Sequence, residues 1–198
     1  MVKKWASIII LLFTILIISY AYFYFKSYPK QHISSALLNN GDLILRCGRS
    51  TESFTVYLTD SESEYTHIGI ISIEKNKPYV IHAVPCKNNI LKKESLSEFL
   101  NPKNTSKFAV YRSNYNAFFL DKVVQKANLF YTKNYEFDNK YDLTTDSKLY
   151  CSELVLKAFR SVGITLEVKS KEFNYILGKH SIIYPSEFTK APFFTKII

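Results

Sequence analysis

The sequence predicts an α+β domain preceded by one N-terminal hydrophobic helix. The first observation behind this prediction is an uncharged apolar run at residues 5–25. The second is a series of short β-rich segments, two of which are separated only by a turn. The third is helical spacing of apolar residues in two later segments, without the regular strand–helix alternation of a parallel α/β sheet.

Length and composition are those of a globular chain. The 198 residues suit one domain with a small appendage. Hydrophobic residues make up 47% of the chain, and 15 Phe and 15 Tyr provide enough apolar area to exclude intrinsic disorder for most of it. Only five Gly and six Pro exclude a collagen-like fibre, and three Cys are too few for a disulfide-framework miniprotein.

The N-terminal run differs from the rest of the chain. Residues 5–25 carry no charge and are long enough to span a bilayer, for which about 20 apolar residues suffice. Lys3 and Lys4 precede the run, and tyrosines at its end suit a membrane interface. We expect residues 1–29 to be a membrane anchor or a cleaved signal segment, although a buried core helix is the alternative. Residues 30–198 would then form one domain in the cell envelope, outside the cytoplasm, with the membrane contacted through residues 5–25.

The formal charge of +9 does not indicate a nucleic-acid partner. Lys3 and Lys4 contribute two of these charges, and the remaining +7 is scattered over residues 26–198 in short mixed runs. The sequence shows no zinc-finger spacing, no helix-turn-helix signature and no glycine-rich phosphate loop. An ordinary basic surface explains the excess, and attraction to an anionic envelope or an acidic substrate is the alternative.

The pattern along the proposed domain predicts its elements in order. These are a linker or short helix at 30–40, a strand at 42–47, a short helix at 51–59, strands at 67–73 and 78–84 joined as a hairpin, a helix at 96–100 capped by Ser95 and Glu98, a strand at 107–112, and helices at 117–131 and 150–162, the last ended by Gly163. Residues 134–149 read as a polar loop, and the tail after Gly163 shows little regular pattern. By position, segments 134–149 and 50–64 are candidates to close a cleft.

Cys151 lies in the first turn of the last predicted helix. It begins an apolar stripe at helical spacing, so its side chain is expected at the buried edge of that stripe. The positive end of the helix and its unpaired N–H groups favour a thiolate there, which would lower the pKa of the thiol. The alternative is that Cys151 is a small buried apolar side chain without chemistry.

Two of the four histidines lie on the arms of the predicted hairpin. If the turn pairs Ile73 with Pro78, Gly69 faces His82, and His67 and His82 share one face as diagonal neighbours, with backbones about 7–8 Å apart. Gly69 leaves space between the two rings. A shift of one residue would place the rings on opposite faces. Either histidine alone would be read as an ordinary core or surface residue, but a shared face next to a cysteine suggests a base and its partner.

Four segments resemble one enzyme family. GDLILR at 41–46, YTHIGII at 65–71, YVIHAV at 79–84 and YCSELV at 150–155 are similar to the permuted NlpC-like papain-fold cysteine hydrolases, the YiiX-like group. The histidine precedes the cysteine, which is the order of the permuted group and the reverse of ordinary papain-like enzymes. The resemblance covers residues 40–165. It implies a permuted papain-like (NlpC-type) fold, with a small, mainly antiparallel sheet packed on helices.

The resemblance also implies site residues. Cys151 would be the nucleophile and His67 the general base, and the third polar position falls on His82. That position is often acidic in the permuted group, so a histidine there is closer to the unpermuted relatives. Tyr65, two residues before His67, is expected to face the cleft and bind substrate, unless it only packs in the core.

The activity implied is that of an amidase or peptidase acting on short or cell-wall peptides. A lipid-directed acyl hydrolase or acyltransferase is an alternative, because lecithin:retinol acyltransferase-like proteins share the permuted arrangement. A catalytically inactive binding module is another. We expect a peptide or acyl substrate, no nucleic acid, no cofactor and no metal, since Cys47, Cys86 and Cys151 lack the ligand spacing of a zinc site. Cys47 and Cys86 would instead be able to pair as a disulfide.

Overall fold

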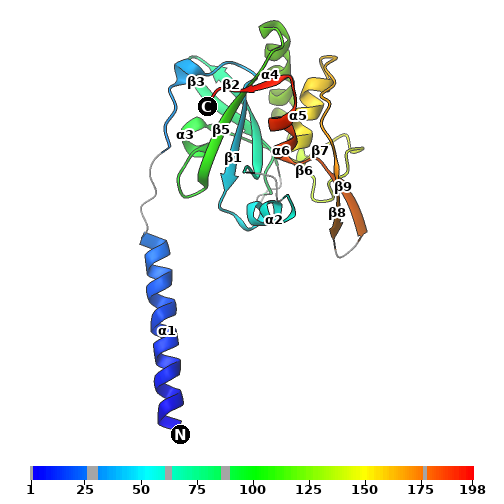
Figure 1. The fold of residues 1–198 in the computed structure, drawn as a ribbon. Helices are drawn as coiled ribbons and strands as arrows, with labels where there is room; N and C mark the ends of the chain where they lie inside the picture. Colours follow the sequence, from blue (N-terminus) through cyan, green and yellow to red (C-terminus); the bar gives the residue numbers. More distant parts are fainter. Residues whose placement is uncertain (1, 26–30, 61–63, 86–89, 176–177) are drawn as a thin grey trace.

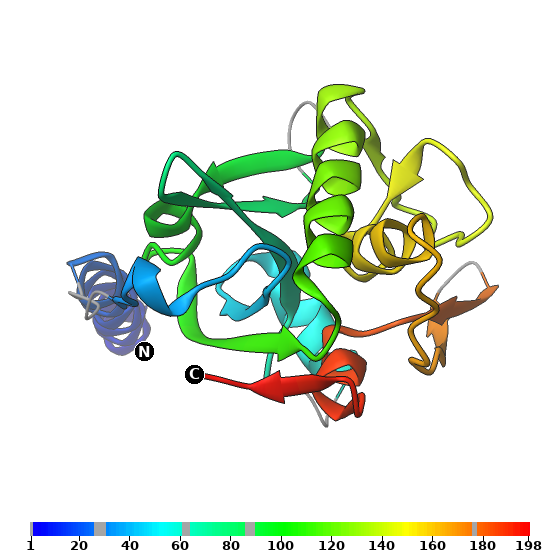
Figure 2. The ribbon, with the colours of Figure 1, turned by 90° about the horizontal axis from the view of Figure 1, so that it is seen from above.

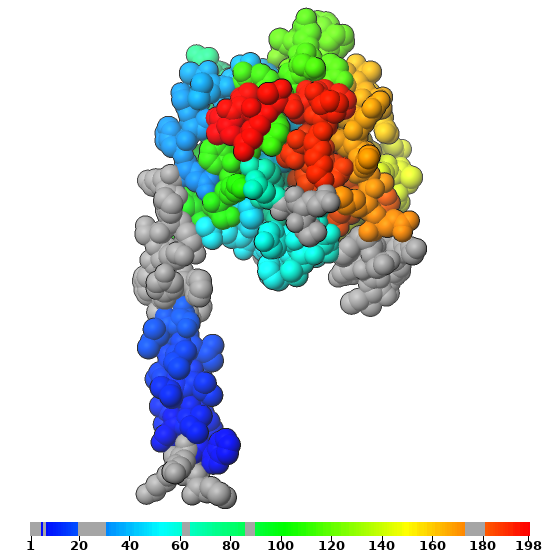
Figure 3. All heavy atoms as spheres, in the orientation of Figure 1, coloured from blue at the N-terminus to red at the C-terminus, as the bar shows by residue number. Residues whose placement is uncertain are grey.

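The structure is a computed structural model that describes residues 2–25, 31–60, 64–85, 90–175 and 178–198. Helix α1 (Val2–Phe25) projects away from the remaining elements (Figures 1 and 3), which confirms the predicted N-terminal helix. Among the helices of the described residues, none combines the length and the apolar character that crossing a bilayer requires. Placement in the cell envelope stays a prediction.

One six-stranded sheet forms the centre of the domain. Its strands follow the order β10-β5-β1-β2-β3-β4, and every neighbouring pair is antiparallel. The strands are β1 (Leu43–Gly48), β2 (His67–Glu74), β3 (Lys77–His82), β4 (Lys92–Ser95), β5 (Thr105–Ser113) and β10 (Phe194–Lys196). The small, mainly antiparallel sheet that the sequence predicts is confirmed.

Each face of the sheet carries its own apolar core. On one face, Leu45 and Ile68 pack with helices α4 (Ala117–Thr132) and α5 (Cys151–Arg160) in the larger core. On the other face, a smaller core gathers Ile44 and Val80 against the 3₁₀ helix η1 (Ser35–Leu37) region and α3 (Leu96–Phe99). Viewed from above, α4 and α5 lie on one side of the strands and α3 on the other (Figure 2). Alternate strand residues face the two cores, as the pleat of a sheet requires.

The β2–β3 hairpin has the predicted register. Ile73 pairs with Pro78, and the two residues of the turn, Lys75 and Asn76, have φ of 48° and 61°. Positive φ at both positions is the geometry of a type I′ turn, which matches the twist of the strands it joins. Ile70 therefore lies opposite Ile81, which places Gly69 beside His82 as expected.

The other predicted helices also form. α2 (Thr51–Thr59) begins at Ser50, whose hydroxyl accepts the N–H of Ser53, and α3 begins with the predicted Ser95–Glu98 capping box. After α5, Gly163 has φ of +82°, a conformation that glycine adopts at no steric cost, and the chain leaves the helix there.

The tail is more regular than its sequence suggests. It contains β8 (Lys171–Tyr175) paired with β9 (Gly178–Ile182), then α6 (Pro185–Lys190), then β10 at the sheet edge. The strand β4 and the short parallel pair β6 (Glu136–Phe137) and β7 (Lys148–Leu149) were also not predicted. Asp60, buried after α2, accepts hydrogen bonds from Lys171 Nζ at 2.9 Å and from the Ser186 hydroxyl. This carboxylate fastens the tail to the end of α2.

Candidate active site

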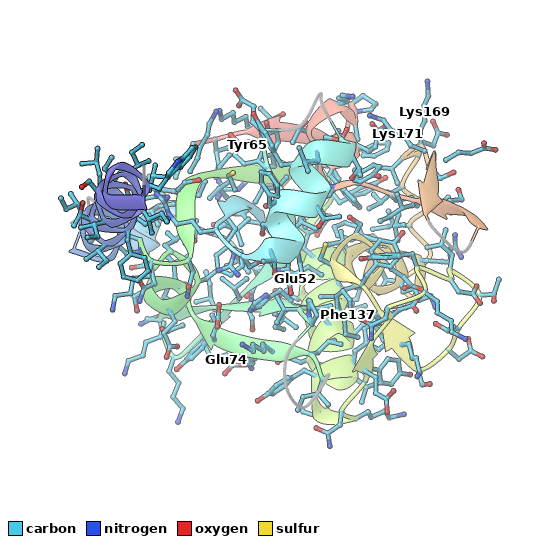
Figure 4. The ribbon with its side chains drawn as sticks, turned by 90° about the horizontal axis from the view of Figure 1, so that it is seen from below. Glu52, Tyr65, Glu74, Phe137, Lys169 and Lys171 are labelled. Carbon is cyan, nitrogen blue, oxygen red and sulfur yellow. The ribbon has the colours of Figure 1, made fainter. Side chains whose placement is uncertain are left out.

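A cavity of about 710 Å³ opens at the end of the sheet where β1 and β3 finish and β2 begins. Cys151, His67 and His82 all line it. Helix α2 forms one wall, and residues 182–185 form another. Figure 4 looks onto this end of the molecule, with α2 in front and two lining residues, Glu52 and Phe137, labelled. Residues between 50 and 59 and residues between 137 and 141 both contribute to the walls, and closure of the cleft by the segments 50–64 and 134–149 stays a prediction.

Cys151 is the first residue of α5, and its surroundings fix that helix end. The N–H of Tyr150 donates to Glu153 Oε2 at 3.3 Å, and the Tyr150 hydroxyl accepts the N–H of Ile183 at 3.1 Å. Glu153 is buried and paired with Lys157, whose Nζ lies 2.9 Å from Glu153 Oε1. The start of α5 is thus tied to the chain on both sides of it, so the backbone that carries the thiol is held in place.

The protonation of the Cys151 thiol differs from the sequence-based expectation. Burial raises its pKa, and this outweighs the opposing effect of nearby hydrogen-bond donors. Those donors are the backbone N–H groups of Ile68, Ser152 and Cys151 itself, with the Ser152 hydroxyl. The prediction that the helix end lowers the thiol pKa is therefore wrong, because desolvation disfavours the charged thiolate more than the helix end favours it.

The His67–His82 pair is a direct contact between two buried rings. His67 Nε2 lies 2.8 Å from His82 Nδ1, and the side chains are 7% and 1% exposed. Both rings pack near Phe99, with centroid distances of 5.9 Å and 5.2 Å. Burial lowers the pKa of both rings, that of His67 well below its ordinary value. Both histidines are therefore neutral at pH 7. Within the pair, Nε2 of His67 contacts His82, and Nδ1 of His67 does not take part in that contact.

Gly69 makes this contact possible. A Cβ built on Gly69 would lie 2.6 Å from Val80 Cγ1 and 3.1 Å from His82 Cβ. The first distance is shorter than any ordinary carbon–carbon contact, so a side chain here would displace one or both neighbours. The absence of a side chain at Gly69 lets β2 and β3 bring the two rings together.

Glu94 also belongs to the site, although it was not predicted from the sequence. Its Oε1 lies 3.2 Å from His82 Nε2 and 3.9 Å from Arg46 Nη1. Arg46 Nη1 also donates to the backbone oxygen of Phe99 at 2.7 Å, and its guanidinium lies 4.3 Å from the centre of the Phe99 ring. No sequence signal marked Glu94, because β4 (KKES) has no apolar alternation and its pairing with β3 is a tertiary feature.

Burial acts to raise the pKa of Glu94, and three neighbours outweigh it. His82 contributes most through the close contact with its ring, followed by the charges of Arg46 and Lys92. The net result is a carboxyl pKa below the ordinary value, so Glu94 is ionised at pH 7.

Cys151 and His67 line the same cavity but are not hydrogen-bonded to each other. Among the described residues, no hydrogen bond links Cys151 Sγ to the His67 ring, although the N–H of Ile68, the residue next to His67, is among the groups that favour the Cys151 thiolate and so act to lower its pKa. The structure thus brings Cys151, His67 and His82 to one cavity.

Tyr65 lies elsewhere. Its side chain is 3% exposed, belongs to the larger core and is not among the residues that line the cavity. Lys107 Nζ lies 5.6 Å from the centre of its ring. The structure thus places Tyr65 in the core rather than at the cavity, as in the packing alternative, and substrate binding by Tyr65 stays a prediction. Tyr65 precedes β2, which begins at His67, so strand alternation does not decide which way its side chain points.

The cavity has walls of two kinds. Charged and polar side chains from β1, α2, β4 and the turn before β5 line part of it, and apolar or aromatic side chains from other segments line the rest. The first group includes Arg46, Arg49, Glu52, Ser53, Lys92, Glu94, Lys103 and Asn104; the second includes Val84, Pro85, Phe137, Tyr141, Ile182, Ile183, Tyr184 and Pro185. This division suits a substrate that has both a polar and an apolar part.

Two comparisons with individual proteins agree with this fold. The protein YiiX of Escherichia coli K12 is 29% identical over 139 residues, which are 68% of this chain and 65% of that relative's own length. This chain thus spans just under two thirds of that relative. A crystal structure titled as the metalloprotein YiiX from Escherichia coli O157:H7 has a TM-score of 0.68 and 21% identity, over 81% of this chain and 96% of that one. The second likeness shows the fold.

The described residues do not fit a metal ion. Among them, no group of three or more His, Cys, Asp or Glu side chains is placed to hold one. Cys47 and Cys151 are free thiols, and Cys86, the other half of the suggested disulfide, lies outside the described residues. The chemistry available at the cavity is therefore that of the thiol, the two imidazoles and the carboxylate.

Most of the chain matches one family. The match runs from residue 37 to residue 198 and includes every cavity-lining residue. The family is described as permuted papain-like amidase enzymes, YaeF/YiiX, C92. A fold with the histidine strands before the cysteine helix, and a thiol and a histidine pair in one cavity, agrees with that description. The chain belongs to the C92 family of permuted papain-like amidases.

Proposed function

We propose that this protein is a cysteine-dependent amidase or peptidase in which Cys151 is the nucleophile, His67 the general base and His82 the residue that orients His67. The supporting observation is the shared cavity, where a hydrogen-bonded pair of buried histidines lies beside a thiol at a helix N-terminus. Nucleophile, base and orienting group are the three parts that acyl transfer by a thiol requires.

The mechanism begins from a neutral pair. Because burial raises the pKa of Cys151 and lowers that of His67, the proton rests on sulfur before substrate binds. His67 Nδ1 removes this proton as Sγ attacks the carbonyl carbon of the substrate, so the charges form only in the transition state. This is general-base catalysis, in which no preformed ion pair is needed.

The following steps use the donors already present around the sulfur. The carbonyl oxygen becomes an oxyanion, which N–H groups at the start of α5 are oriented to stabilise. Protonated His67 returns its proton to the leaving amine, and the carbon–nitrogen bond breaks to leave a thioester on Cys151. A water molecule, deprotonated by His67, attacks the thioester carbonyl; the acid leaves and the thiol regains its proton.

The cavity supports a short peptide-like substrate. Its volume of about 710 Å³ lies within the usual range for sites that enclose a small molecule, and its lining includes both charged and apolar side chains. A peptide with polar and apolar groups would contact both kinds of wall. This favours amide over purely lipid substrates.

The apolar wall supports one second candidate. Ile182, Ile183, Tyr184 and Pro185 form a continuous apolar stretch beside the site, and this stretch would accept the acyl chain of an ester. The same thiol would then form a thioester from a lipid-like ester. Amide and ester substrates therefore need to be tested together.

Substrate profiling tests the proposal. The full chain and its Cys151→Ala variant are assayed against matched peptide and ester libraries, with Cys47→Ala as the control for loss of a free thiol outside the site. We expect hydrolysis by the wild type and by Cys47→Ala, and a loss of at least about 10³-fold in Cys151→Ala. Equal hydrolysis by Cys151→Ala would refute a thiol mechanism, whereas binding without turnover by the wild type would indicate a binding module.

A further inference from the structure

We propose that Glu94 on β4 is a positioning residue that selects the tautomers of both histidines, so that His67 presents an unprotonated Nδ1 to the cavity. The inference rests on the proposed function, because it assigns a role to a residue outside the predicted set of three. It adds a fourth member to that set, supplied by a strand that the sequence did not predict.

The first step concerns His82. Its Nε2 lies 3.2 Å from Glu94 Oε1, a close electrostatic contact that falls short of hydrogen-bond geometry, and an ionised carboxylate attracts a protonated ring nitrogen. The contact is favourable only when His82 Nε2 carries a proton. A lone pair at Nε2 would lie 3.2 Å from the negative carboxylate oxygen and be repelled by it, on a ring that is itself 1% exposed.

In the second step, the tautomer of His82 determines the tautomer of His67. A neutral imidazole holds one ring proton, so a proton at His82 Nε2 leaves a lone pair at His82 Nδ1. That lone pair lies 2.8 Å from His67 Nε2, which must therefore be the donor. His67 then carries its proton at Nε2 and has its lone pair at Nδ1. In the opposite arrangement His67 Nδ1 would be protonated and unable to accept the thiol proton.

Glu94 is held ionised and in place by its other neighbours. Arg46 Nη1 lies 3.9 Å from Glu94 Oε1 and is itself anchored to the backbone oxygen of Phe99 at 2.7 Å. Lys92, which pairs with His82 across the two strands, adds a second positive charge. Arg46, Lys92, His67 and Cys151 are the other titratable groups around His82 and the Glu94–Arg46 contact.

Glu94 also stabilises the charge that forms during the reaction. When His67 takes the thiol proton it becomes an imidazolium, and its Nε2–H bond to His82 strengthens. The positive charge then lies one ring away from the Glu94 carboxylate, whose attraction favours the charged state. No proton has to move to Glu94, in keeping with the role of the third group in other triads.

The tautomers of His67 and His82 can be determined by NMR, without an activity assay. In the Cys151→Ala protein, labelled with ¹⁵N-histidine, protonated and lone-pair ring nitrogens give well-separated signals at neutral pH. We expect His67 to be protonated at Nε2 and His82 at Nε2, and we expect Glu94→Gln to redistribute these protons. A His67 proton at Nδ1 in protein that retains Glu94 would overturn the proposal, whatever the variants do.

Kinetics give a second, independent test. Glu94→Gln keeps the shape of the side chain and removes its charge, and we expect kcat to fall by about 10- to 100-fold with little change in KM. Since the Glu94 charge raises the pKa of His82, its removal should also move the acid limb of the kcat/KM profile to lower pH. Glu94→Asp, which restores the charge, should recover part of kcat.

Glu74→Gln is the matched control. Glu74 is the last residue of β2, which is separated from β4 by β3; its side chain is 48% exposed and pairs with Lys93 away from the histidines. We expect wild-type kinetics from it. If Glu94→Gln behaves like Glu74→Gln while Cys151→Ala is inactive, the role of Glu94 is refuted and the proposed function stands. If the wild type turns over no substrate, the proposed function fails, and the ¹⁵N signals still decide the tautomers.

Discussion

The ionisation of Cys151 shows how a single residue responds to two opposing effects. A helix N-terminus favours a thiolate, whereas desolvation disfavours it, and in this structure desolvation is the larger effect. The buried histidines respond in the same direction, toward neutrality. The resting site is therefore uncharged at the sulfur and at both rings, and Glu94 supplies the nearby negative charge.

Alkylation as a function of pH tests this resting state. With Cys47 and Cys86 replaced by serine, we expect the rate of iodoacetamide labelling of Cys151 to rise with a midpoint above that of a cysteine in a short unstructured peptide. The reason is that only the thiolate reacts, and burial raises the pKa of this thiol. A midpoint below that of the peptide would instead indicate a preformed thiolate.

Gly69 allows a test of the histidine contact by a single methyl group. Gly69→Ala places a Cβ 2.6 Å from Val80 Cγ1 and 3.1 Å from His82 Cβ, so one of the strands must shift. We expect a loss of about 1–3 kcal/mol in the free energy of unfolding, typical of overpacking, together with reduced kcat. Gly163→Ala is the control, since nothing lies within 4 Å of its Cβ position and the strain there is far from the site. Equal losses of kcat in both variants would argue against a specific role for Gly69.

Among the elements, the β2–β3 hairpin and the helix α5 were predictable because their signals are local. Apolar alternation, a short turn and a helical stripe fixed the pairing of Ile73 with Pro78 and the place of Cys151 at a helix start. β4 and the Glu94 contact were not predictable, since they depend on which strand lies beside β3. The core position of Tyr65 was not predictable, because Tyr65 precedes β2 and its direction depends on the packing of the core.

The start of α5 is stabilised by a contact to the tail, and Tyr150→Phe tests it. The Tyr150 hydroxyl accepts the N–H of Ile183 at 3.1 Å, and both residues are buried. Removing the hydroxyl leaves that N–H without its acceptor, which should lower the free energy of unfolding by about 1–3 kcal/mol. Urea denaturation measures this, with Tyr57→Phe, on the exposed side of α2, as the control. No difference between the two variants would show that the contact does not stabilise the fold.

At the scale of the whole molecule, the two ends of the chain differ in their relation to the domain. No described side chain of α1 belongs to either core, whereas Phe194 of β10 is buried in the larger one and pairs with β5. The sequence predicted a separate N-terminal segment from its composition. It did not predict that the C-terminal strand completes the sheet, because a three-residue strand is too short to show alternation.

Truncation tests this difference. A chain that begins at residue 31 should keep the thermal unfolding midpoint of the domain, because none of the described side chains that it loses belongs to either core. A chain that ends at residue 192 should unfold at a clearly lower temperature, because it loses Phe194 and the pairing of β10 with β5. Differential scanning calorimetry of both proteins against the full chain makes the comparison. A lower midpoint in the first truncation would show that the N-terminal segment supports the fold.

The order of the site residues along the chain has a consequence for biosynthesis. His67, His82 and Glu94 are translated well before Cys151, which is carried by a later helix that packs against β2. Because chains are made from the N-terminus and domains fold as units, the histidine hairpin emerges from the ribosome without its nucleophile. If the proposed activity holds, the ribosome-bound chain would gain it only after α5 has been made and has docked. The permuted order would thus delay the onset of that activity until the last third of the chain is being made.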